Sequence, residues 1–144
     1  MNKLSELQAE AKEDLIILDD EDLHQQSYKN QIIKPKWLDY KSKYRMLTFQ
    51  LKADHRRLYR EKWEYYGGKA TNKIYIAKPF DIKVLKTDLG VYISSDDDII
   101  DIELKIEYYE TLVQFIEGVI KSIDNRSWDI KHAQDWKKFL AGSF

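Results

Sequence analysis

The stretch IIDIELKIEYYETLVQFIEGVIKSI, residues 99–123, decides the fold. Apolar side chains recur in it at alternating spacings of three and four residues, which predicts an amphipathic α-helix with more than three heptads of a and d positions. The preceding Ser95-Asp96-Asp97-Asp98 is a typical N-cap signal. The stripe consists of Ile99, Ile102, Ile106, Tyr109, Val113, Ile116, Ile120 and Ile123.

A second apolar row lies beside this stripe and consists of Leu104, Tyr108, Leu112, Phe115 and Val119. One stripe can pack against the rest of a small chain, whereas two adjacent stripes require two neighbours. A chain of 144 residues has few other apolar surfaces to offer. We therefore favour self-association over a monomer that folds every apolar side chain inward. The residues expected to mediate it are Ile102, Ile106, Tyr109, Val113, Ile116 and Ile120.

The whole chain, residues 1–144, is expected to form a single, mainly α domain. Pro35 predicts a break or kink in a long helical pattern, because proline lacks a backbone donor and disfavours helix at the residue before it. The acids at 19–22 suit the N-terminus of that long helix. The expected segments are an N-terminal helix in 1–18, the long helix in 19–66, a basic loop with strands in 67–94, and C-terminal oligomerisation helices in 95–144, the last from Ser127 to Leu140.

Residues 73–93 have a different pattern from the helices on either side. Lys73-Ile-Tyr-Ile-Ala-Lys and Asp81-Ile-Lys-Val-Leu-Lys alternate polar and apolar side chains, with Pro79 between them. Such alternation is typical of β-strands. We expect one or two short strands here, as a β-hairpin or an extended arm.

The composition predicts a folded protein, since a disordered chain rarely has four Trp, ten Tyr and five Phe. The absence of Cys excludes disulfides, thiolate metal sites and cysteine catalysis, and it fits a reducing cytoplasm. The polar N-terminus predicts no signal peptide. No apolar run approaches the roughly 20 residues that span a bilayer, so no membrane segment is expected.

No pattern in the sequence indicates an enzyme. His24, His55 and His132 fall in three different predicted elements, and none has a partner at a metal-ligand spacing. The acids at 96–98 lack the glycine and the terminal glutamate of an EF-hand loop. Gly67-Gly68-Lys69 lacks both the earlier glycine of a P-loop and the Ser or Thr after its lysine. We expect no catalytic activity, no metal and no cofactor.

The formal charge is strongly segregated along the chain. Residues 29–86 contain 16 Lys/Arg and 5 acids, a net charge of +11, whereas 1–28 and 87–144 each have a net charge of −6. A basic block of this size indicates a polyanionic partner. The alternative is a helix face whose charges pair with the acidic parts of the chain.

Cations and aromatic rings are interleaved within this basic block. Lys52, Arg56 and Arg60 form one column of charge on a helix, and three rings spaced by four and three residues form the next column. Cations for phosphates and flat rings for unpaired bases suit a sequence-tolerant single-strand binder, in which stacking contributes roughly 1–3 kcal/mol per base. The alternative is that Trp63 or Tyr66 packs on a neighbouring subunit. The predicted DNA-binding residues are Lys52, Arg56, Arg57, Tyr59, Arg60, Lys62, Trp63, Tyr66, Lys69 and Lys73.

The sequence REKWEYYGGKA, residues 60–70, resembles the DNA-binding motif of the UvsY family, the recombination mediators of T-even-type phages. Lys36-Trp37-Leu38 is similar to the family's early helix, and residues 107–142 follow its C-terminal half in order. By the resemblance, Arg60 and Lys62 take the two basic roles of the motif. Its two tyrosines would be Tyr65 and Tyr66, while Glu61 and Trp63 depart from it.

The resemblance implies a helical ring of six or seven subunits without nucleotidase activity. Such a protein would help a RecA-like phage recombinase displace a single-strand-binding protein from single-stranded DNA, in the cytoplasm of the infected bacterial host. Two alternatives stay open from the residues alone. One is a non-enzymatic helical scaffold protein whose basic face binds an acidic protein partner. The other is an RNA-binding module, since cations and aromatic rings do not distinguish the ribose of RNA from the deoxyribose of DNA.

Overall fold

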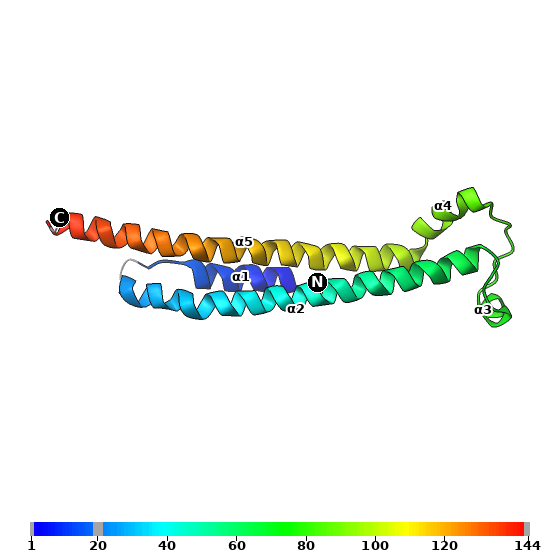
Figure 1. Cartoon of the computed structure of the whole chain (residues 1–144), viewed down its shortest axis with the longest axis horizontal. Coiled ribbons are helices and arrows are strands. Elements are labelled where there is room, and N and C mark those ends of the chain that lie inside the picture. The colour runs from blue at the N-terminus through cyan, green and yellow to red at the C-terminus, as the bar shows by residue number, and fades with distance from the viewer. Residues whose placement is uncertain (1, 19–21, 143–144) are drawn as a thin grey trace. The chain divides into compact units, whose positions relative to one another are not determined.

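The structure is a computed structural model that describes residues 2–18 and 22–142. Of the described residues, 84% are helical, and the predicted mainly α fold with long helices is confirmed. Two short helices, α3 and α4, lie in the connection between the long helices α2 and α5 (Figure 1). The elements in order are α1 (Lys3–Leu15), α2 (Leu23–Tyr66), α3 (Asn72–Ala77), the 3₁₀ helix η1 (Lys86–Asp88), α4 (Leu89–Ser94) and α5 (Asp97–Leu140).

The chain divides into two compact units. The first unit contains the residues up to Tyr44 together with those from Thr111 onward, and the second contains Arg45–Glu110. Among the helices that the structure describes, none has both the length and the apolar character that a bilayer crossing requires.

The core of the first unit is built from α1 and from stretches of α2 and α5. Trp37 is fully buried, and its indole N–H donates to Asp14 Oδ2 at 2.9 Å. In this unit α2 and α5 run antiparallel, because Lys34 forms an ion pair with Asp124 and Lys41 forms one with Glu117. The buried apolar side chains are Leu7, Ala11, Leu23, Ile33, Trp37, Tyr44, Leu112, Ile116, Val119, Ile123 and Ile130.

The predicted break near Pro35 is wrong, since α2 continues through this proline. Pro35 itself is exposed, whereas Ile33 and Trp37 on either side are buried against the core. Contacts of these neighbours hold the backbone helical and outweigh the one hydrogen bond that proline removes. The predicted start of this helix at 19–21 lies outside the described residues.

The C-terminal half is one helix and not two, because α5 has no break before Ser127. Ile123, Arg126 and Ile130 are all buried and continue the spacing of three and four across the predicted boundary. Ser127 is not an N-cap; its Oγ accepts a hydrogen bond from Asn30 Nδ2 at 2.9 Å.

The predicted β-hairpin or extended element in 73–93 is also wrong, since no strand occurs anywhere in 2–18 or 22–142. Short helices α3 and α4 take its place. In α3, the Tyr75 ring stacks on Tyr65 at 5.5 Å and its hydroxyl donates to the Tyr65 carbonyl oxygen at 2.8 Å. In α4, Leu89 and Ile93 are four residues apart, and helical geometry buries both on one side. Six residues of alternating polarity cannot by themselves distinguish the two structures.

A buried arginine joins three segments of the first unit. The guanidinium of Arg126, which is 2% exposed, donates to the carbonyl oxygens of Gln26 at 2.7 Å and Ile16 at 3.2 Å, and to Asn30 Oδ1. These acceptors belong to the connector after α1 and to the start of α2. Arg126 therefore ties both segments to α5.

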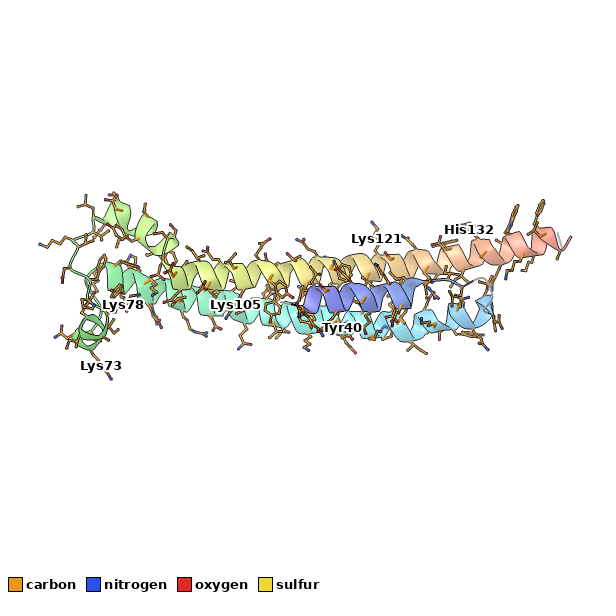
Figure 2. The ribbon with its side chains drawn as sticks, turned by 180° about the vertical axis from the view of Figure 1, so that it is seen from behind. Tyr40, Lys73, Lys78, Lys105, Lys121 and His132 are labelled. Carbon is orange, nitrogen blue, oxygen red and sulfur yellow. The ribbon has the colours of Figure 1, made fainter. Side chains whose placement is uncertain are left out.

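Replacing Arg126 by leucine is expected to lower the free energy of unfolding by at least about 1 kcal/mol, because each buried acceptor left without a donor costs about 1–3 kcal/mol. Urea denaturation followed by circular dichroism measures the loss. The matched control is Lys121→Leu on the exposed side of α5 (Figure 2), which should change stability by less than about 0.5 kcal/mol. Equal effects of the two substitutions would show that the Arg126 hydrogen bonds add nothing to stability.

Candidate nucleic-acid interface

The second unit has its own small core. Leu89, Ile93 and Ile99 form a buried cluster, against which Leu58, Tyr66 and Val84 pack. Here too α2 and α5 run antiparallel, as the ion pair Lys52–Glu110 at 2.7 Å and the hydrogen bond between His55 Nε2 and Glu103 Oε1 at 3.1 Å show. The aromatic rings of Tyr65, Tyr66, Tyr75, Phe80 and Tyr92 lie against one another and join the end of α2 to the segments that follow it.

A glycine turn ends α2 and reverses the chain. Gly68 adopts a φ of +76°, which favours glycine, and the N–H of Lys69 donates to the Glu64 carbonyl oxygen at 2.8 Å. A Cβ at Gly67 would lie 2.8 Å from the Trp63 carbonyl oxygen, so this position also requires glycine. The reversal places the Nζ of Lys69 over the Trp63 ring, 4.4 Å from the ring centroid.

Five of the predicted binding residues form one surface, called here the basic–aromatic face. Arg56, Tyr59, Arg60 and Trp63 lie on the same side of α2 by their spacings of three and four, and Lys69 joins them through its contact with Trp63. Tyr59 is 43% exposed and Trp63 is 39% exposed. Both arginines are exposed, and neither forms an ion pair with any residue that the structure describes.

Three more of the predicted basic residues lie outside this face or are already paired. The ammonium of Lys52 is 2.7 Å from Glu110 Oε1, although the side chain is 44% exposed. Arg57 flanks this face, three residues before Arg60, and pairs with Asp54 at 3.0 Å. Lys73 is exposed on α3 and points away from that helix (Figure 2).

The last two predicted residues, Lys62 and Tyr66, face inward. The side chain of Lys62 is only 12% exposed, and its Nζ lies 2.7 Å from Asp98 Oδ2 and 3.3 Å from Asp96 Oδ2. The Tyr66 hydroxyl donates to Asp96 Oδ2 at 2.6 Å. The other oxygen of Asp96 accepts the N–H groups of Asp98 at 2.9 Å and Ile99 at 3.4 Å, as an N-cap does. We call Lys62, Tyr66, Asp96 and Asp98 the Asp96 cluster.

The Asp96 cluster shifts the pKa of each of three groups. Burial alone would raise the pKa of Asp96, but hydrogen bonds from Tyr66 and Lys62 outweigh burial and hold it below its ordinary value of 3.8. Burial raises the pKa of Tyr66 above 10.0, and its hydrogen bond to Asp96 raises it further. Burial would lower the pKa of Lys62, but hydrogen bonds to Asp98 and Asp96 together raise it above 10.5.

These pKa shifts predict the pH range over which the Asp96 cluster stabilises the fold. The lowered pKa of Asp96 gives stability that is present above pH 3.8 and is lost as the pH falls through the still lower folded pKa. The raised pKa values of Tyr66 and Lys62 give stability that is present below 10.0 and 10.5, respectively, and is lost at higher pH. The cluster is thus intact across the neutral range.

Asp96→Asn is therefore expected to lower the free energy of unfolding at about pH 7, with a difference from the parent chain that shrinks below about pH 3.8. Asparagine still caps a helix, so the loss reports the charge and not the cap. Denaturant titrations at several pH values measure it. The exposed neighbour Asp97→Asn is the control, and equal pH dependence of both variants would contradict the assignment.

Comparison with known proteins identifies a family that matches most of the chain. The family described as "Recombination, repair and ssDNA binding protein UvsY" matches residues 10–143. The chain belongs to the UvsY family. The resemblance noted in residues 60–70 and in the C-terminal half is therefore confirmed.

The chain is also similar to a sequence relative and to solved structures. The "Recombination protein uvsY" of Enterobacteria phage T4 is 26% identical over 140 residues, which cover 97% of this chain and 98% of the T4 protein. A crystal structure of the bacteriophage T4 recombination mediator protein UvsY, in lattice type II, has a TM-score of 0.83 at 25% identity and covers 96% of this chain and 97% of that chain. Lattice type I of the same protein has a TM-score of 0.83 at 24% identity, over 94% and 98% of the two chains.

The stripe predicted for self-association is partly covered within this UvsY-family chain. Ile116 is completely buried and belongs to the core of the first unit. Ile102, Ile106, Tyr109, Val113 and Ile120 are half-buried.

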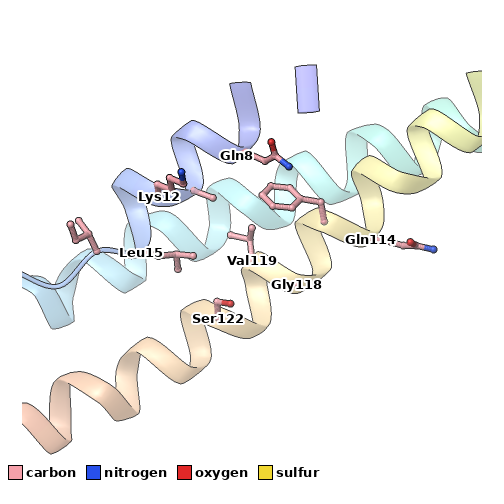
Figure 3. A pocket seen from close by; sticks show the side chains of 10 residues that line it. Gln8, Lys12, Leu15, Gln114, Gly118, Val119 and Ser122 are labelled. Carbon is pink, nitrogen blue, oxygen red and sulfur yellow. The ribbon is translucent and has the colours of Figure 1, made fainter. Parts of the chain in front are cut away.

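The second apolar row is divided between the core and the surface. Leu112 and Val119 are buried, but Leu104 is 59% exposed. Half-buried Phe115 lines a groove of about 900 Å³ between α1 and α5 (Figure 3). Apolar surface therefore stays open along α5, including four exposed side chains near its C-terminal end, which are Trp128, Trp136, Phe139 and Leu140.

Proposed function

We propose that this chain is a non-enzymatic recombination mediator that binds single-stranded DNA through its basic–aromatic face. It acts as a homo-oligomeric ring of six or seven subunits in the cytoplasm of the infected bacterial host. There it helps to load a RecA-like phage recombinase onto a strand that is covered by single-strand-binding protein. Family membership supports the link to recombination and to single-stranded DNA.

The observation that carries the DNA-binding proposal is the pairing of free cations with exposed rings. Arg56 and Arg60 are exposed and make no ion pair within the described part of the chain, so phosphates meet no competing carboxylate there. Trp63 presents an exposed indole between Arg60 and Lys69. A strand can therefore place a base on the ring and the neighbouring phosphates on the cations.

The direct test is a titration of labelled oligo(dT) with the protein at several salt concentrations. Single-strand binding predicts a log–log slope of about −0.7 for each phosphate contact. Duplex DNA and oligo(rU) of the same length are the comparison ligands. No binding to any nucleic acid at low salt would overturn the proposal in favour of a scaffold with an acidic protein partner, and stronger binding of oligo(rU) would favour an RNA-binding module.

Trp63→Ala is expected to weaken oligo(dT) binding about fivefold without changing the salt slope, because stacking of one base contributes about 1 kcal/mol or more and releases no counterion. Trp63→Phe, which keeps a ring, should retain most of the affinity. Intrinsic fluorescence of the parent chain should change on binding. Unchanged affinity of Trp63→Ala, together with loss of assembly, would place Trp63 in a subunit interface instead.

The mediator role is tested with the recombinase and the single-strand-binding protein of the same phage. Addition of this chain should shorten the lag before the recombinase hydrolyses ATP on a covered strand, while the chain alone hydrolyses none. A lag that is unchanged at saturating concentrations would contradict the loading step, even if single-stranded DNA is bound.

A further inference from the structure

Lys62 occupies a different side of α2 from the basic–aromatic face. It lies four residues after the half-buried Leu58 and three before the buried Tyr65, and helical spacing puts all three on the side that faces the core. Arg60, two residues away, is on the exposed side. The two basic positions of the motif therefore point in different directions.

The surroundings of Lys62 are acidic. Besides Asp98 and Asp96, at 2.7 Å and 3.3 Å from its Nζ, Lys62 lines a hollow of about 320 Å³ together with Glu61, Glu64 and Asp98. A phosphate that approached this ammonium would meet those carboxylates. It would also have to take the ammonium from Asp96, whose side chain is only 4% exposed. Leaving that buried carboxylate without its cation is costly.

The contacts of Lys62 suit a different task. Through Asp96, this side chain is joined to Tyr66 in the last turn of α2 and to the N-cap of α5. Trp63 and the glycine turn that carries Lys69 lie directly beside these anchors in the chain. A fixed last turn of α2 therefore fixes where the indole and the Lys69 ammonium stand.

We propose that Lys62 is a positioning residue, which holds the basic–aromatic face in place, and that it does not contact the DNA backbone. The inference rests on the proposed function of that face. Of the two basic residues of the motif, only Arg60 then contacts a phosphate. The geometry of the Asp96 cluster, independent of any relative, carries it.

The first test compares salt slopes for oligo(dT) binding by the full chain. Lys62→Met keeps the length of the side chain and removes its charge. As a positioning change, it should lower the affinity by the same factor at every salt concentration, which leaves the slope unchanged. A slope that becomes shallower by about 0.7 would show a lost phosphate contact and would overturn the inference.

The second test removes a partner of Lys62 and does not depend on the folding of Lys62→Met. Asp98 is 61% exposed in its side chain, so Asp98→Asn should fold normally. If Lys62 bound phosphate, freeing it from Asp98 would strengthen binding and steepen the slope. The matched control is Asp97→Asn, which removes the same charge one residue away, on a side chain that forms no ion pair within the described residues. We expect Asp98→Asn to bind no more tightly than Asp97→Asn, and tighter binding with a steeper slope would overturn the inference.

A structural readout separates this inference from the proposed function. With 5-fluorotryptophan incorporated, the ¹⁹F resonance of Trp63, assigned by its loss in Trp63→Phe, should shift in Lys62→Met even without DNA. An unchanged resonance would overturn the positioning role. Arg60→Ala is measured in the same series. If Arg60→Ala leaves the salt slope unchanged, the proposed DNA-binding face itself is wrong. If Arg60→Ala and Lys62→Met both make the slope shallower, only the positioning role of Lys62 is refuted.

Discussion

Replacing both Arg56 and Arg60 by alanine is expected to weaken binding to single-stranded oligo(dT) about 25-fold at about 0.1 M salt. Both guanidinium groups are exposed and lie one helical turn apart beside exposed rings, so each can take one phosphate. Each lost contact lowers the magnitude of the log–log salt slope by about 0.7, and together they lower it by about 1.4. Fluorescence anisotropy at several salt concentrations measures both quantities, and the two proteins should converge near 1 M salt.

The matched control removes two positive charges of the same unit that lie elsewhere. Arg57 is already paired with Asp54, and Lys105 is exposed on α5. The variant Arg57→Ala/Lys105→Ala changes the net charge equally but should keep the slope of the parent chain. An equal loss of slope in both double variants would mean that the overall field attracts the strand and that the basic–aromatic face is not its binding site.

The helices could be predicted because their signal is long and repeated. Eight apolar residues of 99–123 keep the alternating spacing of three and four residues, and no strand or loop gives that pattern. The short segment 73–93 gave no such redundancy, so its alternation was consistent with strand until the contacts of Tyr75 with Tyr65 decided it. The break predicted near Pro35 was wrong for a related reason, because the local preference of one residue is outweighed by the burial of its neighbours.

The candidate site was predicted in composition but not in its division of roles. Spacing along α2 could place Arg56, Arg60 and Trp63 on one face. It could not show that Lys62 is paired, because Asp96 and Asp98 lie 34 and 36 residues further along the chain. The acids at the start of α5 were recognised as a cap, which Asp96 is. Their second role depends on the packing of two helices and has no local sequence signal.

Assembly should be abolished by Val113→Glu, the substitution with the largest expected effect on the oligomer. Val113 is half-buried in one chain, so a glutamate there can still reach water and the subunit should fold. In a seam between subunits the same carboxylate would lose its water without gaining a partner, which costs several kcal/mol. Sedimentation should show smaller species, with the helical circular dichroism of the parent chain retained.

The DNA titration of the same variant tests whether assembly builds the binding site. One subunit offers only its own few phosphate contacts, whereas a ring multiplies them along one strand, so affinity should fall together with the oligomer. Asn125→Glu is the control, since it adds the same charge at an exposed position of α5 in the same unit. A fully assembled Val113→Glu protein would remove this stripe from the interface. A folded monomer with full affinity would show that each subunit binds the strand alone.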